Sequence, residues 1–231
     1  PAPAEASGAG GDPEDTLKEI MAEADALQVV VENIRGLKFN NPVPQKIISQ
    51  DEWKEFLSKS IEKELPKKKM DGLAESYKLL HLIPGDYNLN EGFEELYSEQ
   101  AAAFYDTEGK YLSLIRTADG GVKGVDASQA GMLKQLGLSA MGILISHELT
   151  HALEDQHFDI TKFSEANAQN DDSALAMSAV VEGDATLVMF EYVITQLTDK
   201  IPMYRNLPAE KKKEAMKVMR QTLQKELTKS A

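Results

Sequence analysis

The chain of 231 residues contains no cysteine, which excludes both disulfide bonds and thiolate metal ligands. Any metal site must therefore use histidine nitrogens and carboxylate oxygens, and only four histidines are available. Basic residues are also scarce, with 25 Lys and Arg against 38 Asp and Glu, which leaves a net charge of −13. Such an acidic surface argues against binding to nucleic acid and against anchoring on anionic lipid.

No apolar run reaches the roughly 18 to 20 residues free of charge that a membrane helix needs, so no membrane span is expected. Hydrophobic residues still make up 42% of the chain, which is enough for a folded core. The first residue is Pro, and residues 1–12 have the composition of a flexible linker. Such a start is expected either after removal of a signal or lipoprotein peptide, which predicts an extracytoplasmic protein, or at a boundary chosen within a longer chain.

Helical periodicity and capping signals recur along the chain and predict a mainly helical α+β fold with a small sheet. Pro13 begins the first helix, Gly36 ends it, Ser49 and Glu52 form a capping box, and Asn90 caps a later helix. Helices are expected over residues 13–35, 50–65, 67–82, 91–100, 127–136, 140–158, 171–197 and 208–229. A short strand is expected near residues 45–48, a Gly-rich loop at 117–125 and an irregular segment at 159–170.

Two apolar runs on either side of a glycine-containing turn at residues 107–109 predict a β-hairpin over residues 101–116. The hairpin comes before the helix expected at residues 140–158. The predicted organisation is a linker (1–12), a mainly helical N-terminal part (13–100) and a metal-binding part (101–231). Alternatively, the N-terminal part and the metal-binding part form one continuous domain (13–231).

The most informative stretch is His147-Glu148-Leu149-Thr150-His151, an H-E-x-x-H pattern inside an apolar run predicted to be helical. Two histidines four positions apart lie on one helical face, about a turn apart, so that a single zinc ion can bind both. Glu148 would stand beside them as a base acting on metal-bound water. The helix should be buried, and unpaired ionisable groups are costly there. The cluster therefore favours a metal site.

A catalytic zinc ion commonly has three protein ligands and an open position for water. A second apolar helix, which we also expect to be buried, carries Glu182 and Asp184. Glu182 lies 31 residues after His151, which leaves enough chain for a loop and an antiparallel return. The two acids are about 200° apart around a helix and cannot both face one ion. One should be a ligand and the other a supporting or structural acid.

This pattern resembles the gluzincin branch of the zincin metallopeptidases, in which two motif histidines and a glutamate on a later helix hold zinc. The resemblance covers roughly residues 101 to 195. It implies that His147, His151 and Glu182 are zinc ligands and that Glu148 is the general base and acid in peptide hydrolysis. It also implies that the hairpin lines the cleft for a peptide or protein substrate. Residues 151–158 and the phrase Glu182-Gly-Asp-Ala are similar to those of uncharacterised, exported bacterial members.

The chain departs from that group in two respects. Familiar gluzincins often have an Asp four residues after the ligand glutamate, where this chain has Thr186. Asp184, or Asp155 on the same helical face as His151, would then support a motif histidine, although Asp155 and Glu154 can equally be exposed acids at a helix end. These enzymes also use a Tyr, His or Arg to stabilise the oxyanion. The candidates here are His157, Tyr192, Tyr204 and Arg205.

Three other interpretations remain open. A non-catalytic zinc-binding or interaction domain would use the same residues, with a fourth ligand closing the site. Buried histidines can also be satisfied within a core without any metal. Finally, Glu148-x-x-His151 and Glu154-x-x-His157 both match the Glu-x-x-His pattern of di-iron carboxylate bundles. That site needs its two copies on different helices, whereas these lie on one helix, about 240° apart around its axis.

Overall fold

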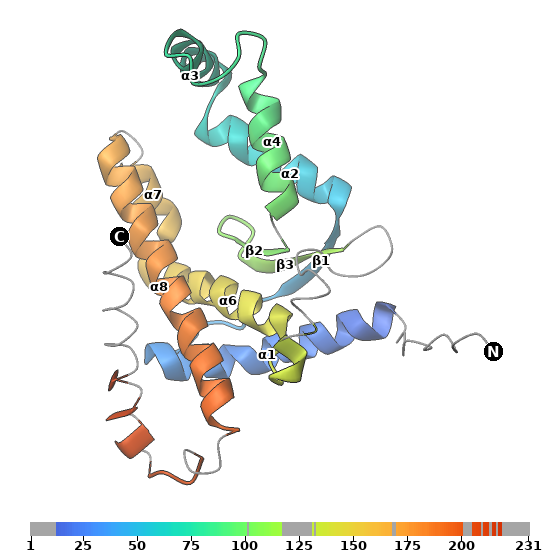
Figure 1. The fold of residues 1–231 in the computed structure, drawn as a ribbon, viewed down its shortest axis with the longest axis vertical. Helices are drawn as coiled ribbons and strands as arrows, with labels where there is room; N and C mark the ends of the chain where they lie inside the picture. Colours follow the sequence, from blue (N-terminus) through green and yellow to red (C-terminus); the bar gives the residue numbers. More distant parts are fainter. Residues whose placement is uncertain are drawn as a thin grey trace, which may run out of the picture.

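The computed structural model of the chain describes residues 13–100, 102–116, 131, 133–167, 170–200, 205–208, 210–212, 214, 215, 217 and 218. This part is α+β and mainly helical, with a three-stranded sheet (Figure 1), which confirms the predicted fold class. The expected linker at 1–12, the loop at 117–125, half of the helix expected at 127–136 and most of the helix expected at 208–229 lie outside the described residues.

The N-terminal half contains α1 (Pro13–Arg35), β1 (Gln45–Ser49), α2 (Gln50–Glu64), α3 (Lys67–Leu79) and α4 (Leu89–Gln100). The hairpin and the following helices are β2 (Ala103–Asp106), β3 (Tyr111–Arg116), α6 (Ala140–Phe158), α7 (Ile160–Asn167) and α8 (Asp171–Thr198). In Figure 1, α6 lies between α1 and α8, while α2, α3 and α4 extend beyond the other side of the sheet.

Several helix ends follow from the local signals that predicted them. The first helix stops at Gly36, whose φ of +70° lies in the left-handed region that glycine adopts at low cost. The capping box before α2 is present in full, because the Ser49 side chain accepts from the Glu52 backbone N–H and the Glu52 carboxylate accepts from the Ser49 N–H. Short-range capping chemistry was therefore sufficient to place these boundaries.

Three local predictions were wrong. Residues 159–170 are not irregular, because the Asp159 side chain accepts from the Lys162 backbone N–H and starts α7. The cap of α4 is Asn88, whose side chain accepts from the backbone N–H groups of Asn90 and Glu91. The third helix ends at Leu79 rather than at residue 82, since the chain leaves it through His81 with a φ of +56°.

The sheet has the strand order β1-β3-β2. The antiparallel pair β2–β3 is the predicted hairpin, with Tyr105 opposite Leu112. On its other side β3 pairs with β1 in parallel, with Ile47 opposite Leu114. This parallel pairing was not predicted, because the two strands are separated in sequence by α2, α3, α4 and β2 and no local signal links them. It leaves β2 as an edge strand, and α6 packs against it.

The two faces of the sheet are covered by two hydrophobic clusters. Side chains alternate along a strand, so Leu112 and Leu114 of β3 face one cluster and Ile115 faces the other. The first cluster joins β2 and β3 to α1, α6 and α8, and the second joins the sheet to α2, α3 and α4. The helix that carries the H-E-x-x-H motif thus packs in the first cluster, together with the N-terminal helix.

Helix α6 is buried as predicted, with ten of its residues in the core. The expectation that α8 is a second buried helix was wrong. Its buried residues are confined to its C-terminal half (Ala185, Val188, Glu191, Tyr192 and Thr198). Leu175 and Val180 in the other half are 72% and 65% exposed. Within the described ranges, α8 alone has the length and hydropathy to cross a membrane, so the absence of a membrane span stays a prediction.

Candidate metal centre

Helix α6 sets the positions of the motif residues. The Ser139 side chain accepts from the backbone N–H of Gly142 at 2.9 Å, which fixes the start of the helix. The same hydroxyl donates to Glu23 of α1 at 2.9 Å. From this start, His147 and His151 both fall on the side of α6 that faces α8, because they are one helical turn apart.

Three side chains converge there from two helices. The Nε2 atoms of His147 and His151 are 3.1 Å apart, and Glu182 Oε2 of α8 lies 3.2 Å from the first and 3.6 Å from the second. In a tetrahedral site with zinc–ligand bonds of about 2.0–2.1 Å, ligand atoms are about 3.3 Å apart. The observed separations match this spacing. Among the described residues, these three form the one group of histidine and acidic side chains arranged to hold a metal ion.

The electrostatics of this group favour a bound cation. Hydrogen bonds with His147 and then His151 hold the pKa of Glu182 well below its usual range, despite partial burial. Burial lowers the pKa of His151, but hydrogen bonds with Glu154 and Glu182 and the charge of Glu148 outweigh this and raise it to about 10. A negative field is thus concentrated on the two facing imidazole nitrogens, where a divalent ion would be attracted.

Glu148 is held beside this group by the edge strand. Its Oε2 accepts from the backbone N–H of Tyr105 in β2 at 2.9 Å. Burial raises the pKa of Glu148, against the lowering effect of His151 and His147. A carboxylate with one oxygen fixed by the backbone and a raised pKa is suited to accept a proton and release it again.

Glu154, rather than Asp155, contacts the second motif histidine. His151 Nδ1 lies 3.2 Å from Glu154 Oε2, and Glu154 is buried. Burial raises the pKa of Glu154, His151 lowers it, and the neighbouring carboxyl group of Asp184 raises it. Asp184 does not join the ligand group, in agreement with its angle from Glu182, and accepts instead from Arg35 Nε of α1 at 2.6 Å.

Asp155 has a different set of partners. Its Oδ2 accepts from the Tyr105 hydroxyl at 2.8 Å and from Lys110 Nζ at 2.7 Å. Both partners belong to the hairpin, so Asp155 ties α6 to the sheet instead of supporting His151. The Asp155 side chain is only 1% exposed. The alternative prediction, that Asp155 is an exposed acid at a helix end, was therefore wrong. Burial, and then the hydrogen bond to Asp155, raise the pKa of Tyr105 well above its usual range.

The four candidates for oxyanion stabilisation are spread over the chain. His157 Nε2 is 2.7 Å from the backbone carbonyl oxygen of Lys38. Tyr192 is buried, and burial, followed by the negative charge of Glu23, raises its pKa. Arg205 is exposed, and Tyr204 lies outside the described residues. The structure therefore brings none of the three described candidates into a contact with His147, His151 or Glu182.

The sequence did not predict the roles of three residues at this centre. Glu154 lies three positions after His151 and could have been found from helical spacing. Tyr105 contributes its backbone N–H, which any residue carries, and Arg35 lies 149 residues from Asp184 in a helix without a motif. Neither has a local signal, because both contacts exist only in the folded chain.

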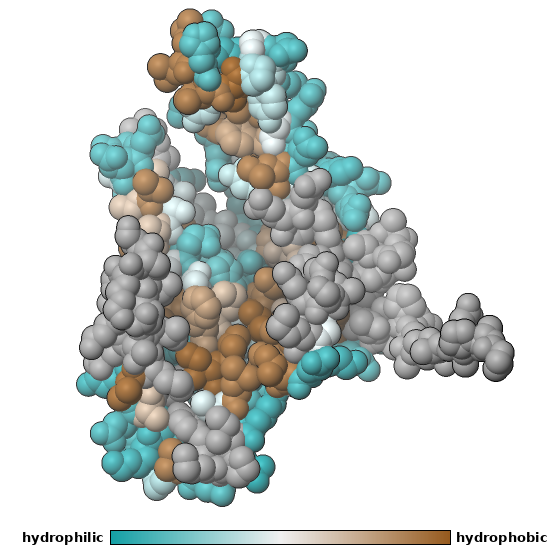
Figure 2. All heavy atoms as spheres, in the orientation of Figure 1, coloured by the Kyte–Doolittle hydropathy of each residue, from teal (hydrophilic) through white to brown (hydrophobic). Residues whose placement is uncertain are grey.

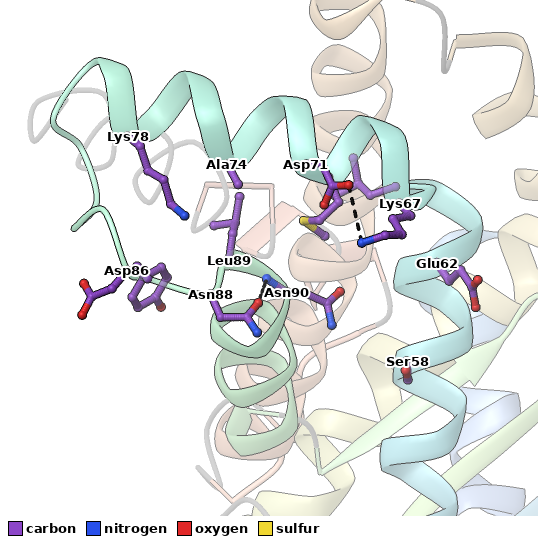
Figure 3. Close-up of a pocket in the computed structure, with 13 residues that line it drawn as sticks. Ser58, Glu62, Lys67, Asp71, Ala74, Lys78, Asp86, Asn88, Leu89 and Asn90 are labelled. Atoms are coloured by element: carbon purple, nitrogen blue, oxygen red, sulfur yellow. Dashed lines mark hydrogen bonds and ion pairs between the residues drawn. The ribbon is translucent and has the colours of Figure 1, made fainter.

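A cavity of about 590 Å³ lies elsewhere, between α2, α3 and α4 (Figure 3). Its lining mixes charged side chains, including Lys67, Asp71 and Lys78, with apolar ones such as Met70 and Leu89. Lys67 and Asp71 form an ion pair of 3.5 Å on its rim. None of the residues of the metal centre lines this cavity, so cavity size does not identify the site of chemistry here.

Comparison of the chain with models of known protein families, with curated proteins and with solved structures finds no match.

Proposed function

We propose that the chain is a zinc-dependent hydrolase of the metallopeptidase type. The observation that carries the proposal is the convergence of His147, His151 and Glu182 at zinc-ligand spacing, with Glu148 fixed beside them. Within the described residues the group has three members, the number typical of a catalytic zinc site, whereas a structural site usually has four. The donor set of two imidazoles and one carboxylate suits zinc.

A zinc ion held by these residues would supply Lewis acidity toward water and a carbonyl oxygen. Glu148 accepts the proton of the attacking water on its free oxygen and passes it to the leaving amine as the peptide C–N bond breaks. The backbone N–H of Tyr105 keeps the other carboxylate oxygen in place. Glu154 accepts the hydrogen bond of His151 Nδ1, which leaves Nε2 with a lone pair for the metal.

The edge position of β2 supports a peptide as the substrate class. An edge strand offers backbone N–H and C=O groups to an extended peptide, which can add to the sheet as a further strand. In this fold β2 is the edge strand that packs against α6, and its Tyr105 already contacts Glu148. A peptide bound along β2 would therefore pass beside the proposed base.

The test compares wild-type protein, purified without added metal, with the variants Glu148→Gln and His151→Ala. A matched control is Glu165→Gln, because Glu165 is an exposed glutamate on α7. We expect one zinc per chain in wild type, in Glu148→Gln and in the control, and a loss of zinc in His151→Ala. Hydrolysis of a quenched fluorescent peptide library should fall by about 10² to 10⁴-fold in Glu148→Gln and stay unchanged in the control.

Other outcomes would contradict the proposal in distinct ways. Bound zinc without hydrolysis by wild type would indicate a non-catalytic zinc-binding domain. Two irons per chain would favour the carboxylate bundle, and no metal in any variant would make His147 and His151 ordinary core residues. Equal hydrolysis by wild type and Glu148→Gln would show that Glu148 is not the general base.

A further inference from the structure

A series of side-chain contacts connects the N-terminal helix to the metal centre. Arg35 Nε at the end of α1 donates to Asp184 Oδ2 on α8 at 2.6 Å. The carboxyl group of Asp184 lies beside that of Glu154 on α6, close enough to raise the pKa of Glu154, and Glu154 Oε2 lies 3.2 Å from His151 Nδ1. Three helices thus contribute one residue each before the proposed ligand is reached.

This arrangement controls how His151 presents its other nitrogen. A carboxyl oxygen on Nδ1 fixes the rotation of the imidazole ring and keeps the Nδ1 proton in place, which directs the Nε2 lone pair toward the partner ligands. Glu154 can do this only if its own side chain is held, and its side chain is 8% exposed with Asp184 as its further partner. The orientation of Asp184 is in turn held by the short contact with Arg35.

Arg35 also offsets a concentration of negative charge. Four acidic side chains lie at or next to the candidate metal centre: Glu148, Glu154, Glu182 and Asp184. The Arg35 side chain is 30% exposed and that of Asp184 is 21% exposed, so the pair is only partly screened by solvent. Without the guanidinium, Asp184 would lose its cationic partner and be repelled by Glu154, and it would turn away from this position.

We infer that Arg35 is a positioning residue of the metal centre, which acts on His151 through Asp184 and Glu154 and tunes metal affinity from outside the motif region. The inference rests on the proposed metal site, but not on catalysis. On this inference, α1 contributes to metal affinity through Arg35 and also packs against the core.

The experiment measures zinc affinity of the metal-free protein by competition with a chromophoric chelator, for wild type, Arg35→Ala, Arg35→Lys and Asp184→Asn. The matched control is Lys38→Ala, because Lys38 forms an ion pair of similar length with Glu32, at 2.7 Å, and does not contact the centre. We expect Arg35→Ala and Asp184→Asn to weaken zinc binding by on the order of tenfold, since removing outer partners of metal-bound histidines costs about 10 to 100-fold. Arg35→Lys should recover part of the loss, and Lys38→Ala should match wild type.

Two further measurements separate positioning from simple stabilisation. The visible absorption bands of the Co²⁺-substituted protein report ligand geometry, and they should shift in Arg35→Ala but not in Lys38→Ala. Urea unfolding of each metal-free variant shows whether it folds. The double variant Arg35→Ala/Asp184→Asn should bind zinc no more weakly than the worse single variant, because both changes break the same series of contacts.

The inference is overturned if Arg35→Ala retains wild-type zinc affinity and cobalt spectrum, whatever its stability. It is also overturned if wild type binds neither metal. Should wild type bind zinc with the expected dependence on Arg35 and yet hydrolyse no peptide, the proposed enzymatic function fails while the positioning part of Arg35 stands.

Discussion

Helices α6 and α8 supply all three proposed ligands, yet they differ in how the fold covers them. Both are apolar in sequence, and both were expected to be buried. Among the residues that the structure describes, α6 is buried between α1, α8 and the sheet, whereas α8 is covered along one side only (Figure 1). The difference teaches that apolar composition indicates how much surface a helix can bury, while the number of neighbours determines how much it does bury.

The same contrast applies to the ligands. His147 and His151 on α6 have side chains that are 19% and 12% exposed, whereas Glu182 on α8 is 58% exposed. The histidines are thus held in a packed helix, and the carboxylate enters from a helix with a solvent-facing side. This asymmetry suits a site that must be rigid on one side and open to substrate on the other.

Matched leucine substitutions should show the largest difference between the two helices. Leu153 on α6 is fully buried, and its change to Ala should lower the free energy of unfolding by about 3 kcal/mol, through lost burial and the cavity left behind. Leu175 on α8 is 72% exposed, and Leu175→Ala should change stability by about 0.5 kcal/mol or less. Urea unfolding of the metal-free protein measures both. An equal cost at Leu175 would mean that the outward side of α8 is covered in solution.

The ion pairing between the helices should make zinc binding depend on pH. In the metal-free chain the pKa of His151 is raised to about 10, so the imidazole carries a proton at neutral pH that zinc must displace. Zinc affinity should therefore rise by about tenfold per pH unit between pH 7 and 9, which is about 1.4 kcal/mol per unit. Chelator competition at several pH values, corrected for the chelator, measures this dependence.

The sign for stability follows from the same shift. A raised pKa stabilises the metal-free fold fully below the ordinary histidine value of about 6.5, and this contribution is lost as the pH rises through about 10. Zinc binding that is independent of pH over this window would contradict the paired arrangement of His151 with Glu154 and Glu182.

Removing the N-cap of α6 or of α8 should give the smallest difference in stability between the two helices. Ser139 accepts from Gly142 N–H at 2.9 Å in a half-buried setting, and Asn170 accepts from Ser173 N–H at 3.1 Å on the surface. Ser139→Ala should cost about 1 kcal/mol, and Asn170→Ala about 0.5 kcal/mol, the low end for a lost cap. Thermal unfolding of both variants provides the comparison. A larger loss at Asn170 would show that the exposed start of α8 contributes more to the fold than its burial indicates.

An exposed apolar end on the opposite side of the sheet shows the same limit of sequence reasoning. Leu79, Leu80 and Leu82, at the end of α3 and just after it, are 71%, 68% and 66% exposed, and Figure 2 shows apolar side chains gathered at that end of the molecule. The third helix was predicted to continue to residue 82, just before Pro84-Gly85, but these leucines have no covering element within the described residues. A leucine contributes to a core only where a second element reaches it.

Local chemistry allowed much of the fold to be predicted. The ends of α1, α2 and α6 were predicted from Gly36, from the Ser49–Glu52 capping box and from Ser139, because caps act over three or four residues. The hairpin β2–β3 was predicted from two apolar runs on either side of a glycine-containing turn. The i, i+4 spacing likewise placed the nitrogens of His147 and His151 side by side, 3.1 Å apart.

Contacts between segments that are distant in sequence could not be predicted from these local signals. Nothing local in residues 45–49 indicated a parallel partner at residues 112–116, and Arg35 carried no sign of its contact with Asp184. Asp155 and Glu154 occupy neighbouring positions, and only the approach of Tyr105 and Lys110 from the hairpin drew Asp155 away from His151.

The sequence by itself determined the class of fold and the helix that carries H-E-x-x-H, and it reduced the acids that could join the two histidines to Glu182 and Asp184. Each of these depends on periodicity, capping or spacing along the chain, which a linear sequence encodes directly. The tertiary structure decided which acid supports His151, which backbone group holds Glu148 and how far α8 is covered. These depend on the packing of α1, α6, α8 and the sheet against one another, and burial and long-range electrostatics exist only once those elements meet.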